Sequence, residues 1–200
     1  MALFPAFLKI EGRRCLVVGG GAVAEEKIGG LLRSGAKVRV VAPHATAGIA
    51  AWADAGKIQW TARQFRPSDI AGAFLVVAAT SSPALHASIY RQARRRAVLC
   101  NVVDDPEHCD FYYGAVVRRG ALQIAISTGG RSPALAQRLK KQFERAFGAE
   151  YEEWMEEIGR IRKSLLAKKL SPERRRILLH RLASETSLAE FLRRRKRPPQ

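Results

Sequence analysis

The sequence predicts an α/β protein: a doubly wound parallel sheet, then a hairpin with a helix, then a small helical domain. Short apolar runs alternate with helix-like stretches through about residue 103, and the run at 74–79 is apolar throughout, as in a strand buried on both faces. Beyond that point two short apolar segments flank Arg119-Gly120, a pattern typical of a hairpin. We therefore expect three segments, 1–112, 113–148 and 149–200.

The strongest local signal is a run of three glycines between a strand and a helix. A buried strand at 14–18 enters the glycines, and a helix-forming stretch at 22–33 leaves them. Read as G-x-G-x-x-A, Gly19 allows a tight turn, Gly21 lets a pyrophosphate approach the backbone, and Ala24 lets the helix pack close to the sheet. The free N–H groups of the helix N-terminus would point at the phosphates. This context favours a Rossmann-type dinucleotide site, and the alternative is a tight turn without a ligand.

The remaining elements are expected from periodicity, glycine and proline. In the first part these are strands at 37–41, 58–61, 74–79 and 98–102, with helices at 46–55 and 83–95. In the second part they are strands at 115–118 and 122–126, a helix at 133–147, and two or three amphipathic helices within 150–195. We expect Arg193 to Arg197 and the final prolines to form a disordered basic tail.

The composition predicts a folded domain with a strong attraction for polyanions. The 200 residues are 47% hydrophobic, with a net charge of +17. Residues 1–110 hold 14 Lys and Arg against 9 Asp and Glu, whereas residues 111–200 hold 21 against 9. Nucleic acid, anionic lipid and a polycarboxylate substrate all fit this balance, and a solvated basic surface is the plain alternative.

The three cysteines, Cys15, Cys100 and Cys109, are widely spread and form no C-x-x-C pair. They indicate neither a disulfide framework nor a zinc knuckle, which favours a reducing, cytoplasmic setting. No apolar stretch reaches the roughly 18 residues of a membrane span. Residues 1–7 are apolar but are interrupted by Pro5, and we do not interpret them as a signal peptide.

Ligands of such sheets bind outside the carboxyl ends of the strands. Three segments should meet there: 19–23, 78–80 and 101–105. The end of the second strand, 41–44, lacks both the acidic residue typical of NAD sites and a basic residue for a 2′-phosphate. The residues themselves therefore leave NAD and NADP open.

Two carboxylates, Asp104 and Asp105, directly follow a predicted strand. A carboxylate in that place can take a proton from a bound substrate, and burial beside a cofactor could tune its pKa. Asp-Asp-Pro is equally ordinary turn chemistry. Asp104, His108 and Cys109 match the spacing of no standard metal site, so we expect no resident metal.

A second anion-binding segment is predicted at 127–133. Gly129 and Gly130 could free backbone N–H groups, Arg131 adds a positive charge, and the helix that begins after Ser132-Pro133 adds its dipole. The alternative is a plain N-cap turn.

Together and in this order, these motifs resemble the precorrin-2 dehydrogenase and sirohydrochlorin ferrochelatase family, the N-terminal type of siroheme synthase. The resemblance covers nearly all of residues 1–150. It rests on FPAFL at 4–8, VVGGGAVAEEK at 17–27, NVVDDP at 101–106 and ISTGGRSPALA at 126–136, with shorter matches at 12–13, 78–80 and 109–111. One departure is Gly114, where the family pattern usually has proline, and it implies a less rigid hinge.

The resemblance implies NAD-dependent oxidation of precorrin-2 to sirohydrochlorin, often followed by Fe²⁺ insertion to give siroheme. It also implies a homodimer formed through the hairpin and the helix after the nucleotide-binding fold. Asp104 falls on the acid–base group of both steps. Cofactor-binding residues are then Gly19, Gly21, Ala22, Val23, Pro43, His44, Ala79, Thr80 and Asn101. Thr128, in the loop that faces the substrate, joins Gly129, Gly130, Arg131 and Ser132 as candidate substrate-binding residues.

The chemistry of this substrate agrees with the residues. Precorrin-2 carries eight carboxylates, which a basic cleft would hold through charge-assisted hydrogen bonds. Iron would be bound by the substrate's nitrogens, so no protein ligand cluster is needed. Family members often join this unit to a methyltransferase, and since the sequence ends at residue 200 we expect no such activity.

Two alternatives stay open at this stage. The protein could be a dehydrogenase without chelatase activity, with iron inserted by a separate enzyme. It could also be a dinucleotide-sensing regulator that binds nucleic acid through its basic half, although no recognisable reading motif is present. Neither a role for the basic tail nor a modification of Thr128 follows from the sequence.

Overall fold

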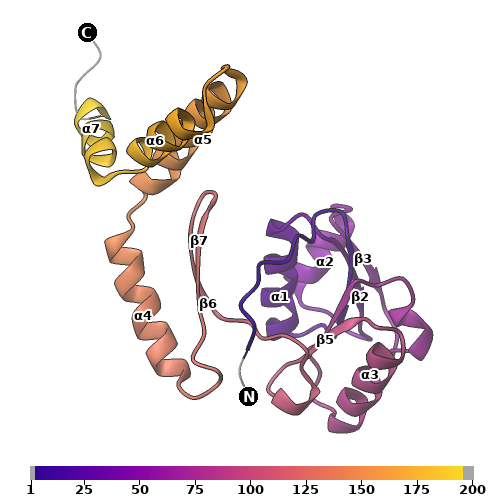
Figure 1. Ribbon diagram of the computed structural model, residues 1–200. Helices are drawn as coiled ribbons and strands as arrows, with labels where there is room; N and C mark the ends of the chain where they lie inside the picture. The colour runs from indigo at the N-terminus through magenta and orange to yellow at the C-terminus, as the bar shows by residue number, and fades with distance from the viewer. Residues whose placement is uncertain (1–2, 196–200) are drawn as a thin grey trace. The chain divides into compact units, whose positions relative to one another are not determined.

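The computed structural model describes residues 3–195, which form two compact units. The first unit comprises residues 4–113, and the second comprises residues 114–195 together with Leu3 (Figure 1).

A five-stranded parallel sheet forms the centre of the first unit. Its order is β3-β2-β1-β4-β5, so the chain winds outward in one direction from β1 and then in the other. The reversal at β1 makes the gap between β1 and β4 the switch point, where ligands of such sheets bind. The predicted doubly wound sheet is confirmed. The strands are β1 Arg14–Val18, β2 Lys37–Val41, β3 Ile58–Thr61, β4 Leu75–Ala78 and β5 Leu99–Val102.

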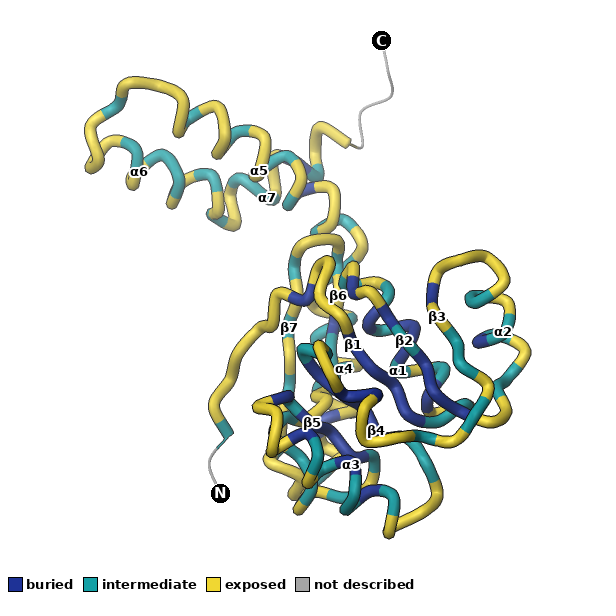
Figure 2. Tube along the Cα trace, turned by 90° about the vertical axis from the view of Figure 1, so that its right-hand side faces the viewer, coloured by how far each residue is buried: buried dark blue, intermediate teal, exposed yellow. Residues whose placement is uncertain are grey.

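Helices cover both faces of this sheet because alternate strand residues point to opposite sides. Val17 of β1 packs with α1 (Ala22–Arg33) and α2 (Ala47–Asp54). Leu16, its neighbour in the chain, packs on the other face with α3 (Pro83–Arg95) and the short 3₁₀ helix η1 (Pro67–Ile70). Strands β1, β2, β4 and β5 are among the most deeply buried parts of the described chain (Figure 2).

Serine caps start several helices as the sequence predicts. Ser82 accepts a hydrogen bond from the Leu85 amide at 3.4 Å, and Pro83 occupies the first turn of α3. Ser132 does the same for the Leu135 amide at 3.2 Å. Such caps satisfy N–H groups that have no partner within the helix. Helix α1 differs, because it begins after Gly21 and has no side-chain cap.

A buried carboxylate fixes η1 to the sheet. Asp69 is 4% exposed, and its Oδ1 lies 2.7 Å from Arg63 Nη2 and 2.9 Å from Arg39 Nη2. Its Oδ2 accepts from Arg63 Nη1 and from the Arg66 amide, each at 2.8 Å. The hydrogen bonds from Arg63, more than any other contact, lower the pKa of the Asp69 carboxyl to about 2. The segment between β3 and β4 is therefore held by this charge cluster together with Ile70, which is fully buried.

The second unit begins with the predicted hairpin. Strands β6 (Ala115–Arg119) and β7 (Leu122–Ile126) pair antiparallel, with Val117 opposite Ile124. The Arg119 guanidinium donates to the carbonyls of Glu144 at 2.9 Å and Phe147 at 2.7 Å, which closes the end of the following helix. The four helices are α4 Pro133–Ala146, α5 Glu150–Ala167, α6 Pro172–Leu182 and α7 Glu185–Arg195.

The prediction of a disordered basic tail is wrong for Arg193 to Arg195. These residues form the last turn of α7, where Arg194 pairs with Glu157 at 2.7 Å and Arg195 pairs with Glu153 at 2.6 Å. The acidic first half of α5 supplies the opposite charge that a pattern confined to the tail does not reveal. Lys196, Arg197 and the final prolines lie outside the described residues. Within residues 3–195, no helix combines the length and apolar character that crossing a membrane requires.

We expect Asp69→Asn to lower the free energy of unfolding by about 2 kcal/mol at neutral pH, because two arginines lose their shared partner. The native pKa lies below the unfolded value of roughly 3.9, so the stabilisation is complete above pH ~4 and disappears as the pH falls toward 2. Urea unfolding at several pH values measures both effects. The exposed Asp54→Asn is the control and should behave like the wild type; equal stabilities of all three proteins would contradict the role of Asp69.

Candidate functional site

A large pocket of the first unit lies at the carboxyl ends of the strands. Its volume is about 1060 Å³, and it opens where β1 gives way to α1. Segments that follow β1, β2, β4 and β5 line it, as expected for ligand binding at a switch point. The lining residues are Val18, Gly19, Gly20, Gly21, Ala22, Val23, Val41, Ala42, Pro43, His44, Gln64, Phe65, Ala79, Thr80, Ser81, Ser82, Pro83, Leu85, His86, Val103, Asp104 and Asp105.

The three glycines of the turn have different structural roles. Gly19 has φ +125°, and a Cβ there would overlap the carbonyl of Ala79. A Cβ on Gly20 would overlap the carbonyl of His44, and Gly20 also accepts a hydrogen bond from the Thr46 amide at 2.9 Å. A Cβ on Gly21 would meet nothing within 4 Å. Gly19 and Gly20 therefore let neighbouring loops approach, whereas Gly21 leaves the pocket open in front of α1.

The N-terminus of α1 fits an anionic group. The first intrahelical bond runs from the Glu25 amide to the Gly21 carbonyl at 3.0 Å, so the amides of Ala22, Val23 and Ala24 have no partner within the helix. With no capping side chain and no Cβ on Gly21, the exposed Ala22 and Val23 leave the start of the helix accessible to a pyrophosphate. Ala24 is fully buried against the sheet, as predicted. The open cradle and the free amides match the phosphates of a dinucleotide.

Most of the predicted cofactor-binding residues line the pocket. Gly19, Gly21, Ala22, Val23, Pro43, His44, Ala79 and Thr80 are among its walls. Asn101 is not: it is 6% exposed, and its amide nitrogen donates to the Phe111 carbonyl at 2.8 Å and to Cys109 Sγ at 3.3 Å. The Asn101 side chain thus braces the segment after β5 from the inside.

Several wall residues were missed by sequence reasoning. Gln64 and Phe65 come from the segment after β3, and His86 comes from the first turn of α3. His86 could have been found, because it follows the Ser82-Pro83 helix start at the carboxyl end of a predicted strand. Gln64 and Phe65 belong to an irregular segment with no local signal.

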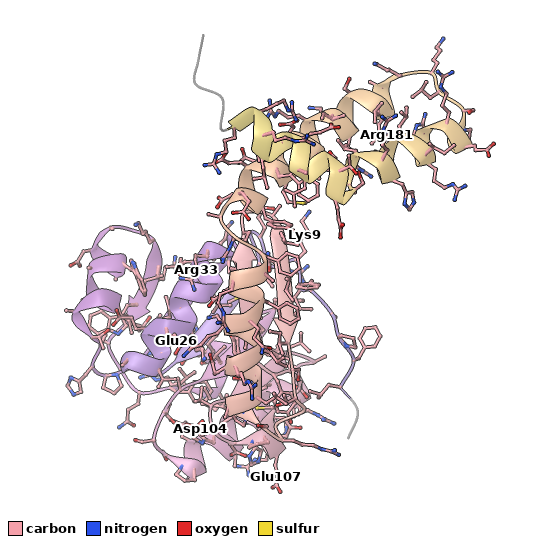
Figure 3. The ribbon with its side chains drawn as sticks, turned by 90° about the vertical axis from the view of Figure 1, so that its left-hand side faces the viewer. Lys9, Glu26, Arg33, Asp104, Glu107 and Arg181 are labelled. Carbon is pink, nitrogen blue, oxygen red and sulfur yellow. The ribbon has the colours of Figure 1, made fainter. Side chains whose placement is uncertain are left out.

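Asp104 and Asp105 both line the pocket, on a tight turn. The Asp105 amide donates to the Val102 carbonyl at 3.3 Å, and Asp104, the third residue of that turn, has φ +59°. A left-handed conformation is uncommon for a residue other than glycine, and such conformations cluster at functional sites. The Asp104 side chain is exposed, on the segment that leaves β5 (Figure 3). The turn interpretation is therefore right about the backbone and leaves the carboxylate available to a ligand.

The predicted anion-binding loop, 127–133, belongs to the second unit. Gly129 and Gly130 have φ +61° and +78°, and a Cβ on either would meet nothing within 4 Å. The Gly129 and Ser132 amides already donate to Ser127 Oγ and Thr128 Oγ1, each at 3.2 Å. Fewer N–H groups are free than the sequence suggested, so the exposed Arg131 side chain is the loop's main attraction for an anion.

Metal-ligating side chains do not gather in the part of the chain that the structure describes: no three His, Cys, Asp or Glu residues among 3–195 could hold one ion. Fold and pocket together define a Rossmann-type dinucleotide-binding protein.

Comparisons with known proteins show which family within this class the chain is similar to. A family model described as NAD(P)-binding matches residues 6–115, and one described as sirohaem biosynthesis protein central matches residues 119–146. A siroheme synthase of Neisseria meningitidis is 42% identical over 177 residues, and siroheme synthase 1 of Aeromonas salmonicida is 36% identical over 192. These matches cover 88% and 96% of this chain but only 37% and 41% of the relatives, so the chain spans well under half of their length.

A solved structure of SirC, a precorrin-2 dehydrogenase, is similar along nearly its whole length. The match covers 96% of this chain and 98% of that one, with a TM-score of 0.79 and 27% sequence identity. The chain belongs to the family of NAD(P)-binding proteins of siroheme biosynthesis that its sequence motifs resemble.

We expect Gly21→Asp to separate folding from cofactor binding. Aspartate is a favourable N-cap and the φ of −83° suits it, so the melting temperature should not fall. The new carboxylate would repel the pyrophosphate, and NAD should bind at least about ten-fold more weakly, or ~1.4 kcal/mol. Isothermal titration measures the affinity. Gly20→Ala is the contrasting variant, because its methyl group overlaps a backbone carbonyl and should destabilise the fold. Unchanged NAD affinity in Gly21→Asp would place the cofactor elsewhere.

Proposed function

We propose that the protein oxidises precorrin-2 to sirohydrochlorin with NAD as the hydride acceptor. The observation that carries this proposal is the exposed Asp104 carboxylate, which a left-handed turn presents at the wall of a pocket suited to a dinucleotide. The likeness to SirC, a precorrin-2 dehydrogenase, along 98% of that chain supports the choice of substrate.

The proposed chemistry needs one proton acceptor from the protein. The substrate loses a hydride and a proton as a new carbon–carbon double bond forms, and NAD, when bound, supplies the hydride acceptor. Asp104 receives the proton, and its exposure to solvent lets it pass the proton on. The free amides of α1 orient the cofactor through its pyrophosphate.

The cofactor wall in this proposal consists of Gly19, Gly21, Ala22, Val23, Pro43, His44, Ala79 and Thr80, with Asn101 bracing it from behind. We propose NAD rather than NADP, since the end of β2 offers no lysine or arginine among the pocket residues for a 2′-phosphate. Thr128, Gly129, Gly130, Arg131 and Ser132 are proposed to bind the carboxylates of the tetrapyrrole, with Arg131 supplying the charge.

We further propose that the same protein inserts Fe²⁺, a substrate held by the macrocycle's nitrogens, to give siroheme. Chelation must remove two pyrrole protons, which Asp104 could accept in turn. The alternative is a dehydrogenase that leaves chelation to another enzyme.

Purified protein incubated with sirohydrochlorin and Fe²⁺ without NAD distinguishes these two possibilities. The absorbance spectrum of siroheme should appear faster than in a protein-free control, and the rate should fall in Asp104→Asn. A rate equal to the control would restrict the protein to dehydrogenation.

We also propose an oligomeric state and a cellular location for the protein. We propose a homodimer formed through 113–148, where Leu135 on α4 is 46% exposed, with 1–112 binding the cofactor and 149–200 forming a separate helical domain. We place the protein in the cytoplasm, which its free thiols at Cys15, Cys100 and Cys109 support.

Asp104→Asn is the sharpest test of the dehydrogenase. Asparagine tolerates the left-handed conformation and keeps the shape of the side chain, but it cannot accept the proton at neutral pH. We expect kcat for precorrin-2 oxidation to fall by at least about 100-fold. The Kd for NAD should change less than about two-fold, because the pyrophosphate site is untouched.

Asp104→Ala should lose activity equally, but it also places alanine at φ +59°, which adds backbone strain. Normal turnover by Asp104→Asn would remove this carboxylate from the mechanism.

A further inference from the structure

Two histidines lie near the carboxylate of Asp105, the residue that follows Asp104. Asp105 Oδ2 lies 2.7 Å from His108 Nδ1 and 4.0 Å from His86 Nδ1. The other ring nitrogen of His86, Nε2, lies 2.8 Å from the Thr80 carbonyl. His86 is 8% exposed, and both it and Asp105 line the pocket, whereas His108 is not among the lining residues.

The partners of these rings decide which nitrogens carry protons. The Thr80 carbonyl can only accept, so His86 Nε2 must donate to it. An ionised Asp105 can only accept as well, so His108 Nδ1 donates to Asp105. His86 Nδ1 lies 4.0 Å from the same oxygen, which is beyond hydrogen-bond distance. His86 therefore contacts the segment after β4 through the Thr80 carbonyl, whereas His108 donates the hydrogen bond that holds Asp105.

The hydrogen bond from His108 to Asp105 holds a turn with an uncommon backbone conformation. Asp104 has φ +59°, a conformation that a residue other than glycine keeps only where its surroundings enforce it. Asp105 is the last residue of that turn, and its carboxylate is held by His108 from the following 3₁₀ turn. His108 is itself packed edge-on against Tyr90 of α3, with ring centroids 5.0 Å apart. Contacts therefore run from Tyr90 of α3 through His108 to Asp105, the residue after Asp104.

We propose that His108 is a positioning residue, which holds the Asp105 carboxylate and thereby keeps Asp104 in the conformation that presents its carboxylate to the pocket. This inference rests on the proposed role of Asp104. His108 does not need to touch the reacting atoms. A small misplacement of a catalytic group lowers the rate of the chemical step more than it lowers binding.

Two variants of His108 separate its hydrogen bond from its packing. His108→Phe keeps a ring against Tyr90 but loses the donor to Asp105. His108→Asn loses the ring but places an amide donor near the position of Nδ1. We expect kcat for precorrin-2 oxidation to fall about ten-fold in His108→Phe and to return to within about two-fold of the wild type in His108→Asn. KM for precorrin-2 and Kd for NAD should stay within about two-fold in both.

Glu107→Gln is the matched control, because Glu107 lies on the same 3₁₀ turn and is exposed (Figure 3). It should leave kcat, KM and Kd unchanged. A wild-type kcat in His108→Phe would overturn the proposal, as would a defect in His108→Asn equal to that in His108→Phe. A loss confined to NAD affinity would also overturn it.

Hydrogen exchange tests the anchor without any substrate. In His108→Phe, amide hydrogens in peptides covering 103–109 should exchange faster. The reason is that the hydrogen bond from the Asp105 amide to the Val102 carbonyl depends on the turn that His108 holds. In His108→Asn and Glu107→Gln exchange should match the wild type. If the wild type fails to oxidise precorrin-2, the proposed function is wrong, and exchange alone then decides whether His108 holds the turn. Unchanged exchange in His108→Phe would show that it does not.

Discussion

The close approach of three backbone segments at the end of β1 is the constraint on which the site depends. Gly19 touches the segment after β4, and Gly20 touches the segment after β2, at places where any Cβ would overlap a carbonyl. Because those two contacts close the sides, α1 can start immediately beyond them with its first amides uncovered. A side chain at either glycine would push the walls apart, whereas one at Gly21 would only fill the opening.

Hydrogen bonds and ion pairs of side chains stabilise the loops that this backbone arrangement brings together. Glu25 in the first turn of α1 accepts a hydrogen bond from the Thr46 hydroxyl, and Thr46 also caps α2. On the opposite face of the sheet, Asp69 holds the segment between β3 and β4 through two arginines. These contacts bind the connections to the sheet alongside apolar side chains such as Ile70, which is fully buried.

The electrostatic character of the two units differs for a physical reason. In the first unit Asp105, at the pocket, accepts a hydrogen bond from His108, whereas Asp104 is exposed. The second unit carries most of the excess of arginine and lysine, and its acidic residues lie mainly at the start of α5, where Glu153 and Glu157 pair with α7. The excess positive charge of the second unit would therefore attract a polycarboxylate.

The sequence by itself determined the doubly wound sheet, the glycine turn, the hairpin and the two aspartates after β5, because each is encoded by neighbours along the chain. Only the tertiary structure decided that Gly20 is as constrained as Gly19, that Asn101 faces inward, and that His86 and Asp105 line the same pocket. It also decided that Arg193 to Arg195 form the end of a helix that pairs with α5. Most of these features join residues that are well separated in the sequence, such as Gly20 and His44 or Glu157 and Arg194, and such residues approach one another only after the chain has folded.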